Sequence, residues 1–145
     1  MTINETQQEI IEEFEGLTDW MDRYAYIIDL GNTLPEFPEN EKTPANLIEG
    51  CQSRVWIHAD RDADGIIKFE ADSDALIVKG IAALLLRVLS GHTAKEIAEA
   101  DLTFIDAIGL GEHLSPTRSN GLRAMVKEMK NYAKAYMMID NGADK

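Results

Sequence analysis

Residues 55–89 read VWIHADRDADGIIKFEADSDALIVKGIAALLLRVL, and this stretch decides the fold. In its first half, Val55, Ile57 and Ala59 alternate with polar or aromatic residues, and Ile67 and Phe69 resume the alternation after the turn at Gly65. Alternation on both sides of a polar turn predicts an antiparallel β-hairpin. In the second half the apolar spacing becomes helical, which predicts a core helix that begins at a cap on Asp72 or Ser73 and stops at Gly91.

The rest of the chain is mostly helical in pattern. Apolar spacing predicts a helix over 4–16 capped by Asn4, a second from Thr18 to Gly31, a short one over 94–100 capped by Thr93, and a long one from 116–117 to Ile139. Residues 32–44, with three of the four prolines, predict a loop, and 102–116 predict a compact irregular segment. The expected fold class is therefore α+β, with a small antiparallel sheet packed against helices in a single domain over 1–145.

Composition excludes several classes of protein. The formal net charge is −12, which disfavours nucleic-acid binding because phosphate recognition needs a basic surface. No apolar run approaches the ~18 residues of a membrane span, and the N-terminal stretch has no export signal. The charge is uneven, since residues 1–41 hold 11 acidic side chains and one basic side chain, Arg23. A single cysteine excludes an internal disulfide and fits a reducing cytoplasm.

No metal site is expected. The segment DRDADG at 60–65 matches the start of an EF-hand calcium loop, but the twelfth position is Ala71 instead of glutamate and both flanks read as strands. A solvated hairpin turn is the better interpretation. The histidines His58, His92 and His113 are scattered along the chain and predict no ligand set.

The remaining candidate is Cys51, the only cysteine of the chain. It follows Gly50, whose conformational freedom suits a sharp loop, and it comes just before the first predicted strand. A thiolate there is a nucleophile for a sulfur electrophile or a carbonyl. A lone buried cysteine without any reactivity remains the alternative.

Three motifs in order resemble the SufE family of sulfur acceptors in bacterial iron–sulfur cluster assembly. They are NLIEGCQSRVWI at 46–57, DSDALIVKGIAALLL at 72–86 and IGLGEHLSPTRSNGL at 108–122. The resemblance covers about residues 11 to 132 and implies the SufE/NifU (IscU-like) fold. It assigns persulfide sulfur to Cys51 and places Ser73, Asp74 and Arg118 near the cysteine loop, which also contains Gly50 and Gln52.

The same resemblance implies the partners. A cysteine desulfurase of the SufS or CsdA type donates the sulfur, and a SufBCD-type scaffold receives it. Pyridoxal phosphate belongs to the desulfurase, so no cofactor is expected in this chain, and neither nucleic acid nor membrane is an expected partner. Two alternatives stay open: a cysteine hydrolase that uses Cys51 with His58 or His113, and a regulatory module that docks on a desulfurase without carrying sulfur.

Overall fold

The hairpin predicted around Gly65 is present and forms most of the sheet. The computed structural model describes residues 1–48 and 53–143, and in it β1 (Val55–Arg61) pairs antiparallel with β2 (Ile66–Ser73), with Val55 opposite Ser73 and Arg61 opposite Ile67. Asp62 Oδ1 accepts from the backbone N–H groups of Asp64 and Ile66 at 2.9 and 3.0 Å. Gly65 adopts a φ of 81°, which suits glycine in such a turn. Residues 62–65 of the DRDADG segment thus form the hairpin turn, and Asp60 and Arg61 are the last residues of β1.

A two-residue strand that the sequence analysis missed completes the sheet. β3 (His92–Thr93) pairs with Ile66 and Ile67 of β2, so the strand order is β1-β2-β3. It follows α3 (Leu76–Leu89), which returns the chain along the sheet to the start of β2. The class expected from the sequence, α+β with a small antiparallel sheet, is confirmed.

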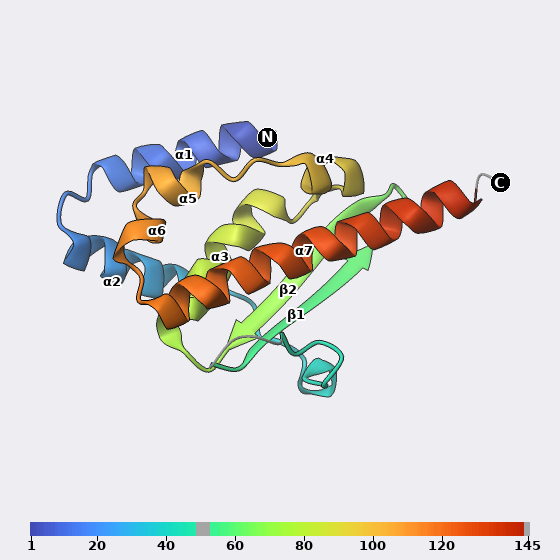
Figure 1. The fold of residues 1–145 in the computed structure, drawn as a ribbon, viewed down its shortest axis with the longest axis horizontal. Coiled ribbons are helices and arrows are strands. Elements are labelled where there is room, and N and C mark those ends of the chain that lie inside the picture. The colour runs from blue at the N-terminus through green and yellow to red at the C-terminus, as the bar shows by residue number, and fades with distance from the viewer. Residues whose placement is uncertain (49–52, 144–145) are drawn as a thin grey trace.

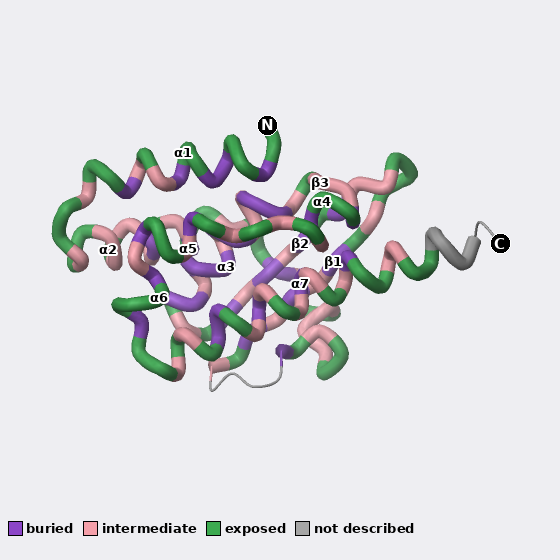
Figure 2. The backbone as a smooth tube through the Cα atoms, turned by 45° about the horizontal axis from the view of Figure 1, so that its top comes forward, coloured by how far each residue is buried: buried purple, intermediate pink, exposed green. Residues whose placement is uncertain are grey.

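The apolar face of the hairpin and the helices that cover it form the core. Val55, Ile57, Ile67 and Phe69 are buried, as the period-2 pattern predicts, and nine residues of α3 are buried with them. The long helix α7 (Pro116–Ala143) runs across this face next to α3 (Figure 1). Figure 2 shows the buried stretches of the sheet and α3 at the centre of the molecule, and the exposed positions of α1 on its outer side.

The first two helices pack on α3. They are α1 (Ile3–Glu15) and α2 (Trp20–Gly31). A Cβ atom on Gly80 of α3 would lie 2.1 Å from the carbonyl oxygen of Ile27 in α2, so glycine is required for this close backbone approach. At the surface, Arg87 of α3 donates hydrogen bonds to Glu9 and Glu13 of α1, and the first of these is 2.5 Å long.

Two predicted helix caps are wrong. The first helix is capped by Thr2 instead of Asn4, because Thr2 and Glu5 form a reciprocal capping box. The core helix begins after Ala75, since β2 continues through Asp72 and Ser73 and pairing with β1 takes precedence over capping. Thr93 does cap α4 (Ala94–Glu99), as predicted.

The two segments predicted as irregular contain short helices. These are η1 (Glu39–Glu41) in the proline-rich stretch, and α5 (Phe104–Ala107) and α6 (Leu110–His113) between α4 and α7. Each has at most four residues, too few for a recognisable apolar period. None of the helices within the described residues is long and apolar enough to cross a lipid bilayer.

Candidate functional site

The segment around Cys51 is held at both ends by backbone pairing. Ile48 N–H donates to the carbonyl of Val55 at 2.8 Å, and Ile57 N–H donates to the carbonyl of Asn46 at 3.0 Å. These bonds lay residues 46–48 beside the start of β1. Gly50, Cys51 and Gln52 lie outside the described residues. In the sequence, Cys51 is three positions from Ile48 and three positions from Arg54.

Asp74 fixes the point at which this segment enters β1. Its Oδ1 accepts a hydrogen bond from the backbone N–H of Arg54 at 3.0 Å, and its own N–H donates to the carbonyl of Arg54 at 3.2 Å. The pair continues the β1–β2 ladder one step past Val55 and Ser73. The hydrogen-bond partner of the Asp74 carboxylate is therefore the backbone at the entry to β1.

Ser73 turns the chain from β2 towards α3. It is buried, its hydroxyl accepts from the N–H of Ala75 at 3.2 Å, and its N–H donates to Asp72 Oδ1 at 2.8 Å. The structure therefore places Ser73 and Asp74 together beside Arg54, where the chain enters β1.

Asp72, near the end of β2, forms an ion pair with Lys42 and so holds the stretch upstream of residue 48 beside Ser73 and Asp74. Lys42 Nζ lies 3.2 Å from Asp72 Oδ2, and Lys79 Nζ lies 3.4 Å from Oδ1. Partial burial favours the protonated carboxyl, but the hydrogen bonds from Lys42 and Ser73, together with the charge of Lys79, hold the pKa of Asp72 below its ordinary value. Asp72 therefore stays ionised at neutral pH and keeps Lys42 in place. Residues 42, 46–48, 54 and 72–74 hold the described parts of the chain on either side of residues 49–52, and we call this set the loop frame.

Arg118 lies near the start of α7, at the end of the molecule where α3 also begins (Figure 1). Its guanidinium donates a hydrogen bond to the hydroxyl of Tyr24, and its Cζ lies 5.3 Å from the centre of the Tyr24 ring. Within residues 1–48 and 53–139, no hydrogen bond or ion pair joins Arg118 to Asp74. Tyr24 in turn packs edge-on against Trp20, and the ring of His113 stacks on Trp20 with centroids 4.3 Å apart.

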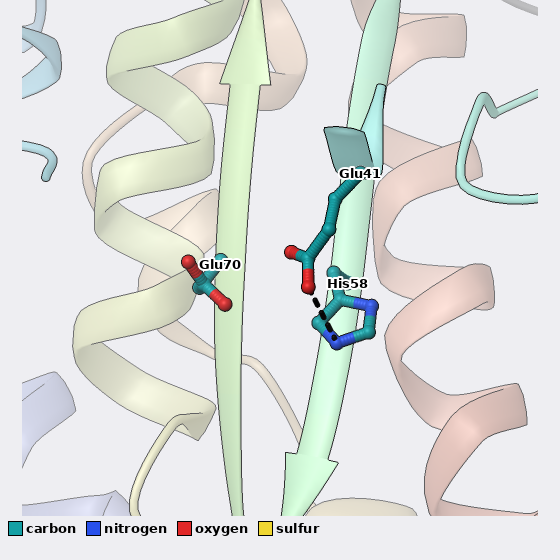
Figure 3. A group of neighbouring side chains, drawn as sticks. All are labelled: Glu41, His58 and Glu70. Carbon is teal, nitrogen blue, oxygen red and sulfur yellow. Dashed lines mark ion pairs between the residues drawn. The ribbon is translucent and has the colours of Figure 1, made fainter. Parts of the chain in front are cut away.

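Sequence reasoning missed three parts of this arrangement. The backbone of Arg54 is a partner of Asp74, and a backbone group gives no signal in the amino-acid pattern. Tyr24 pairs with Arg118 across 94 positions. Glu41, His58 and Glu70 bring together the only group of three or more possible metal ligands found within the described part of the chain (Figure 3).

The structure defines a small α+β protein whose only cysteine lies, in the sequence, just before the first strand of a three-stranded antiparallel sheet. The model of the SufE family, described as an Fe–S metabolism associated domain, matches residues 8–133. This chain belongs to the SufE family, which associates it with sulfur transfer in iron–sulfur metabolism.

Relatives and a solved structure agree with the family. An uncharacterized SufE-like protein of Rhizobium meliloti (strain 1021) is 47% identical over 129 residues, which cover 86% of this chain and 92% of that protein. An uncharacterized SufE-like protein of Rhizobium etli is 48% identical over 130 residues, which cover 87% and 88%. The solution structure of a hypothetical protein from Thermus thermophilus superposes with a TM-score of 0.74 at 22% identity, over 92% of this chain and 96% of that one, and supports the fold alone.

Proposed function

We propose that this protein is a sulfur acceptor and carrier that takes persulfide sulfur from a cysteine desulfurase onto Cys51. The observation that carries the proposal is the loop frame: the described residues on either side of the segment with the only cysteine are held by hydrogen bonds, at Ile48–Val55 and Asp74–Arg54. A rigid base beneath a short reactive segment suits a thiol that has to be offered to another protein. Membership of the SufE family supports the same chemistry.

The proposed step is a thiol exchange. The Cys51 thiolate attacks the outer sulfur of a persulfide on the cysteine of the desulfurase, and a new S–S bond forms to Cys51. The S–S bond of the donor persulfide breaks, and the cysteine of the desulfurase leaves as a thiolate. This thiolate takes up the proton that the Cys51 thiol lost when it ionised. No external oxidant is needed, because the sulfur moves at the same oxidation level. A chain with one thiol has no second cysteine to resolve the persulfide as an internal disulfide.

The proposed partners are a desulfurase of the SufS or CsdA type, which the carrier stimulates by removing its persulfide, and a SufBCD-type scaffold that receives the sulfur. Pyridoxal phosphate belongs to the desulfurase. We place the activity in the reducing cytoplasm, where a lone reactive thiol is not consumed by disulfide formation.

In this proposal the neighbours of Cys51 control its presentation. Asp74 and Ser73 hold the entry to β1, and Gly50 and Gln52 belong to the presenting loop. Arg118 orients the start of α7 through its contact with Tyr24. None of these neighbours takes part in bond making, which belongs to Cys51.

Mass spectrometry after incubation with a desulfurase and free cysteine tests the proposal. We expect a mass gain of one or more sulfur atoms on the intact chain, reversed by a thiol reductant and missing in Cys51→Ser. An unchanged mass while the desulfurase turns over would exclude the carrier. If Cys51→Ser stimulates the desulfurase as well as the unmodified chain does, the protein is a regulatory module instead.

A hydrolase that uses His58 or His113 gains no support from the geometry. His58 Nε2 lies 3.2 Å from Asp60 and 3.6 Å from Glu41, and His113 stacks on Trp20. Each ring thus has other partners in the described structure.

A further inference from the structure

A mixed cluster of carboxylates and one imidazole lies on the outer face of the hairpin, away from the helices. His58 of β1 and Glu70 of β2 are directly opposite each other in the strand register, and Glu41 reaches them from η1 (Figure 3). One ligand atom of each residue lies within 4.8 Å of those of the other two. Asp60, two positions along β1, adds a carboxylate oxygen 3.2 Å from His58 Nε2.

The charges of this cluster are unbalanced. Three carboxylates lie close to a single imidazole, and even a protonated imidazole supplies only one positive charge. Glu41 Oε2 is buried and, within the described residues, has no hydrogen-bond partner, although the whole side chain is 28% exposed. A buried carboxylate oxygen without a partner is costly, so the cluster favours an added cation.

The nearby lysines do not supply that cation in the structure. Lys42 follows Glu41 directly, but its Nζ pairs with Asp72 and Glu39 at 3.2 Å each. Lys68 lies opposite Asp60 in the strand register and is exposed. Neither lysine forms an ion pair with Glu41 or Glu70 in the described part of the chain.

We propose that Glu41, His58 and Glu70, with Asp60 as a fourth donor, bind one divalent first-row transition ion of the zinc class. An imidazole nitrogen favours such ions over magnesium and calcium, which prefer an all-oxygen set. In a tetrahedral zinc site, ligands at about 2.0–2.1 Å lie about 3.3 Å from one another. The 3.2 Å and 3.6 Å separations from His58 Nε2 to Asp60 and Glu41 match that spacing. The ligand atom of Glu70 lies within 4.8 Å of those of Glu41 and His58, so a change of its side-chain rotamer would complete the set.

The bound ion would fasten the segment upstream of Cys51 to the sheet. The Glu41 carbonyl accepts a hydrogen bond from the Asn46 side chain at 2.7 Å, and Asn46 pairs with Ile57 of β1. Glu41 thus belongs to the same stretch that ends at Ile48. This inference does not rest on sulfur transfer by Cys51, and the two can fail separately.

Isothermal titration of the full chain with zinc chloride tests the site, in a Cys51→Ser background so that the thiol does not bind zinc. We expect saturation at one ion per chain and at least tenfold weaker binding after His58→Ala, Glu41→Gln or Glu70→Gln. His92→Ala removes an imidazole at β3 and serves as the control, with zinc affinity expected to stay within twofold of the background.

A second readout separates binding from folding. Thermal melts with and without zinc should show a zinc-dependent rise in Tm for the background and the His92→Ala control, and no rise for the three ligand variants, each of which should still unfold cooperatively without zinc. Absence of saturable binding would overturn the proposal. So would zinc binding in His58→Ala at the affinity of the background.

Discussion

Replacing Asp74 by alanine tests whether the loop frame controls how fast the Cys51 thiol reacts. The change removes the only side-chain hydrogen bond that the described structure shows at the entry to β1, from the N–H of Arg54 to Asp74 Oδ1 at 3.0 Å. The backbone bond from Asp74 N–H to the carbonyl of Arg54 remains. Asp74 is exposed, so its truncation leaves no cavity, and the change acts on the anchor alone.

The size of the effect follows from the exposure of this bond. A net hydrogen bond at an exposed site contributes about 1 kcal/mol, because water replaces the lost acceptor. If the Cys51 thiol reacts through opening of the loop, its alkylation rate scales with the open population, so about 1 kcal/mol raises the rate about fivefold. The measurement is the rate of iodoacetamide addition, followed by intact mass, in a chain with a single thiol.

Asp74→Asn is the matched control, since it keeps an acceptor oxygen and removes the charge. We expect its alkylation rate to stay within twofold of that of the unmodified chain, and the Tm of both variants to fall only slightly. Equal rates for Asp74→Ala and the unmodified chain would refute the anchoring role. Equal acceleration in both variants would show that charge, and not the hydrogen bond, closes the loop.

Three further outcomes are expected. Arg118→Ala should lower sulfur acceptance from the desulfurase while the Tm is kept, and a loss of activity only in proportion to stability would make Arg118 scaffolding. Gly80→Ala should destabilise the fold by about 3 kcal/mol in chemical denaturation, because its Cβ would meet the carbonyl of Ile27 at 2.1 Å; an unchanged midpoint would contradict this close crossing. The hydrogen bond from Arg87 lowers the pKa of Glu13 below 4.5, against the effect of partial burial, so this pair stabilises the fold fully above pH about 4.5 and the contribution is lost as the pH falls through the folded-state pKa. Acid titration of Glu13→Gln, followed by Tm, should lack that loss.

The parts of the fold that the sequence predicts are those with a long repeating pattern. The alternation from Val55 to Phe69 predicts the hairpin because every second side chain has to face the helices. The strand at His92–Thr93 has two residues and no period, so only its pairing with β2 defines it. The sequence predicts the cap of α3 too early, because Asp72 and Ser73 are good capping residues that also continue the β2 ladder. Their pairing with β1 decides between the two roles.

In the candidate site, too, the sequence predicts some parts and leaves others out. Cys51 stands out because it is the only thiol, and its motif carries the resemblance to the family. Arg118 is held by a hydrogen bond to Tyr24, 94 positions away in the sequence, and no local spacing encodes such a contact. Glu41 joins His58 and Glu70 only because the proline-rich stretch folds back over the sheet, which a pattern of turn residues does not specify.

The hydrogen bonds of the loop frame cost less free energy to open than the packed core does. A sulfur carrier can use this difference to present its thiol without unfolding. Ile27 of α2 and the central residues of α3 are fully buried and pack backbone to backbone at Gly80, whereas Asp74 and Arg54 meet at the surface. Segments held by a few exposed hydrogen bonds open locally at far lower free energy than a close-packed core unfolds. Opening at Asp74 should therefore leave the helices and the sheet intact. Gly80→Ala should then lower the Tm without a matching rise in Cys51 alkylation under native conditions, and Asp74→Ala should do the reverse. If both variants change both quantities together, the segment and the core form one cooperative unit, and a partner could expose Cys51 only by unfolding the protein.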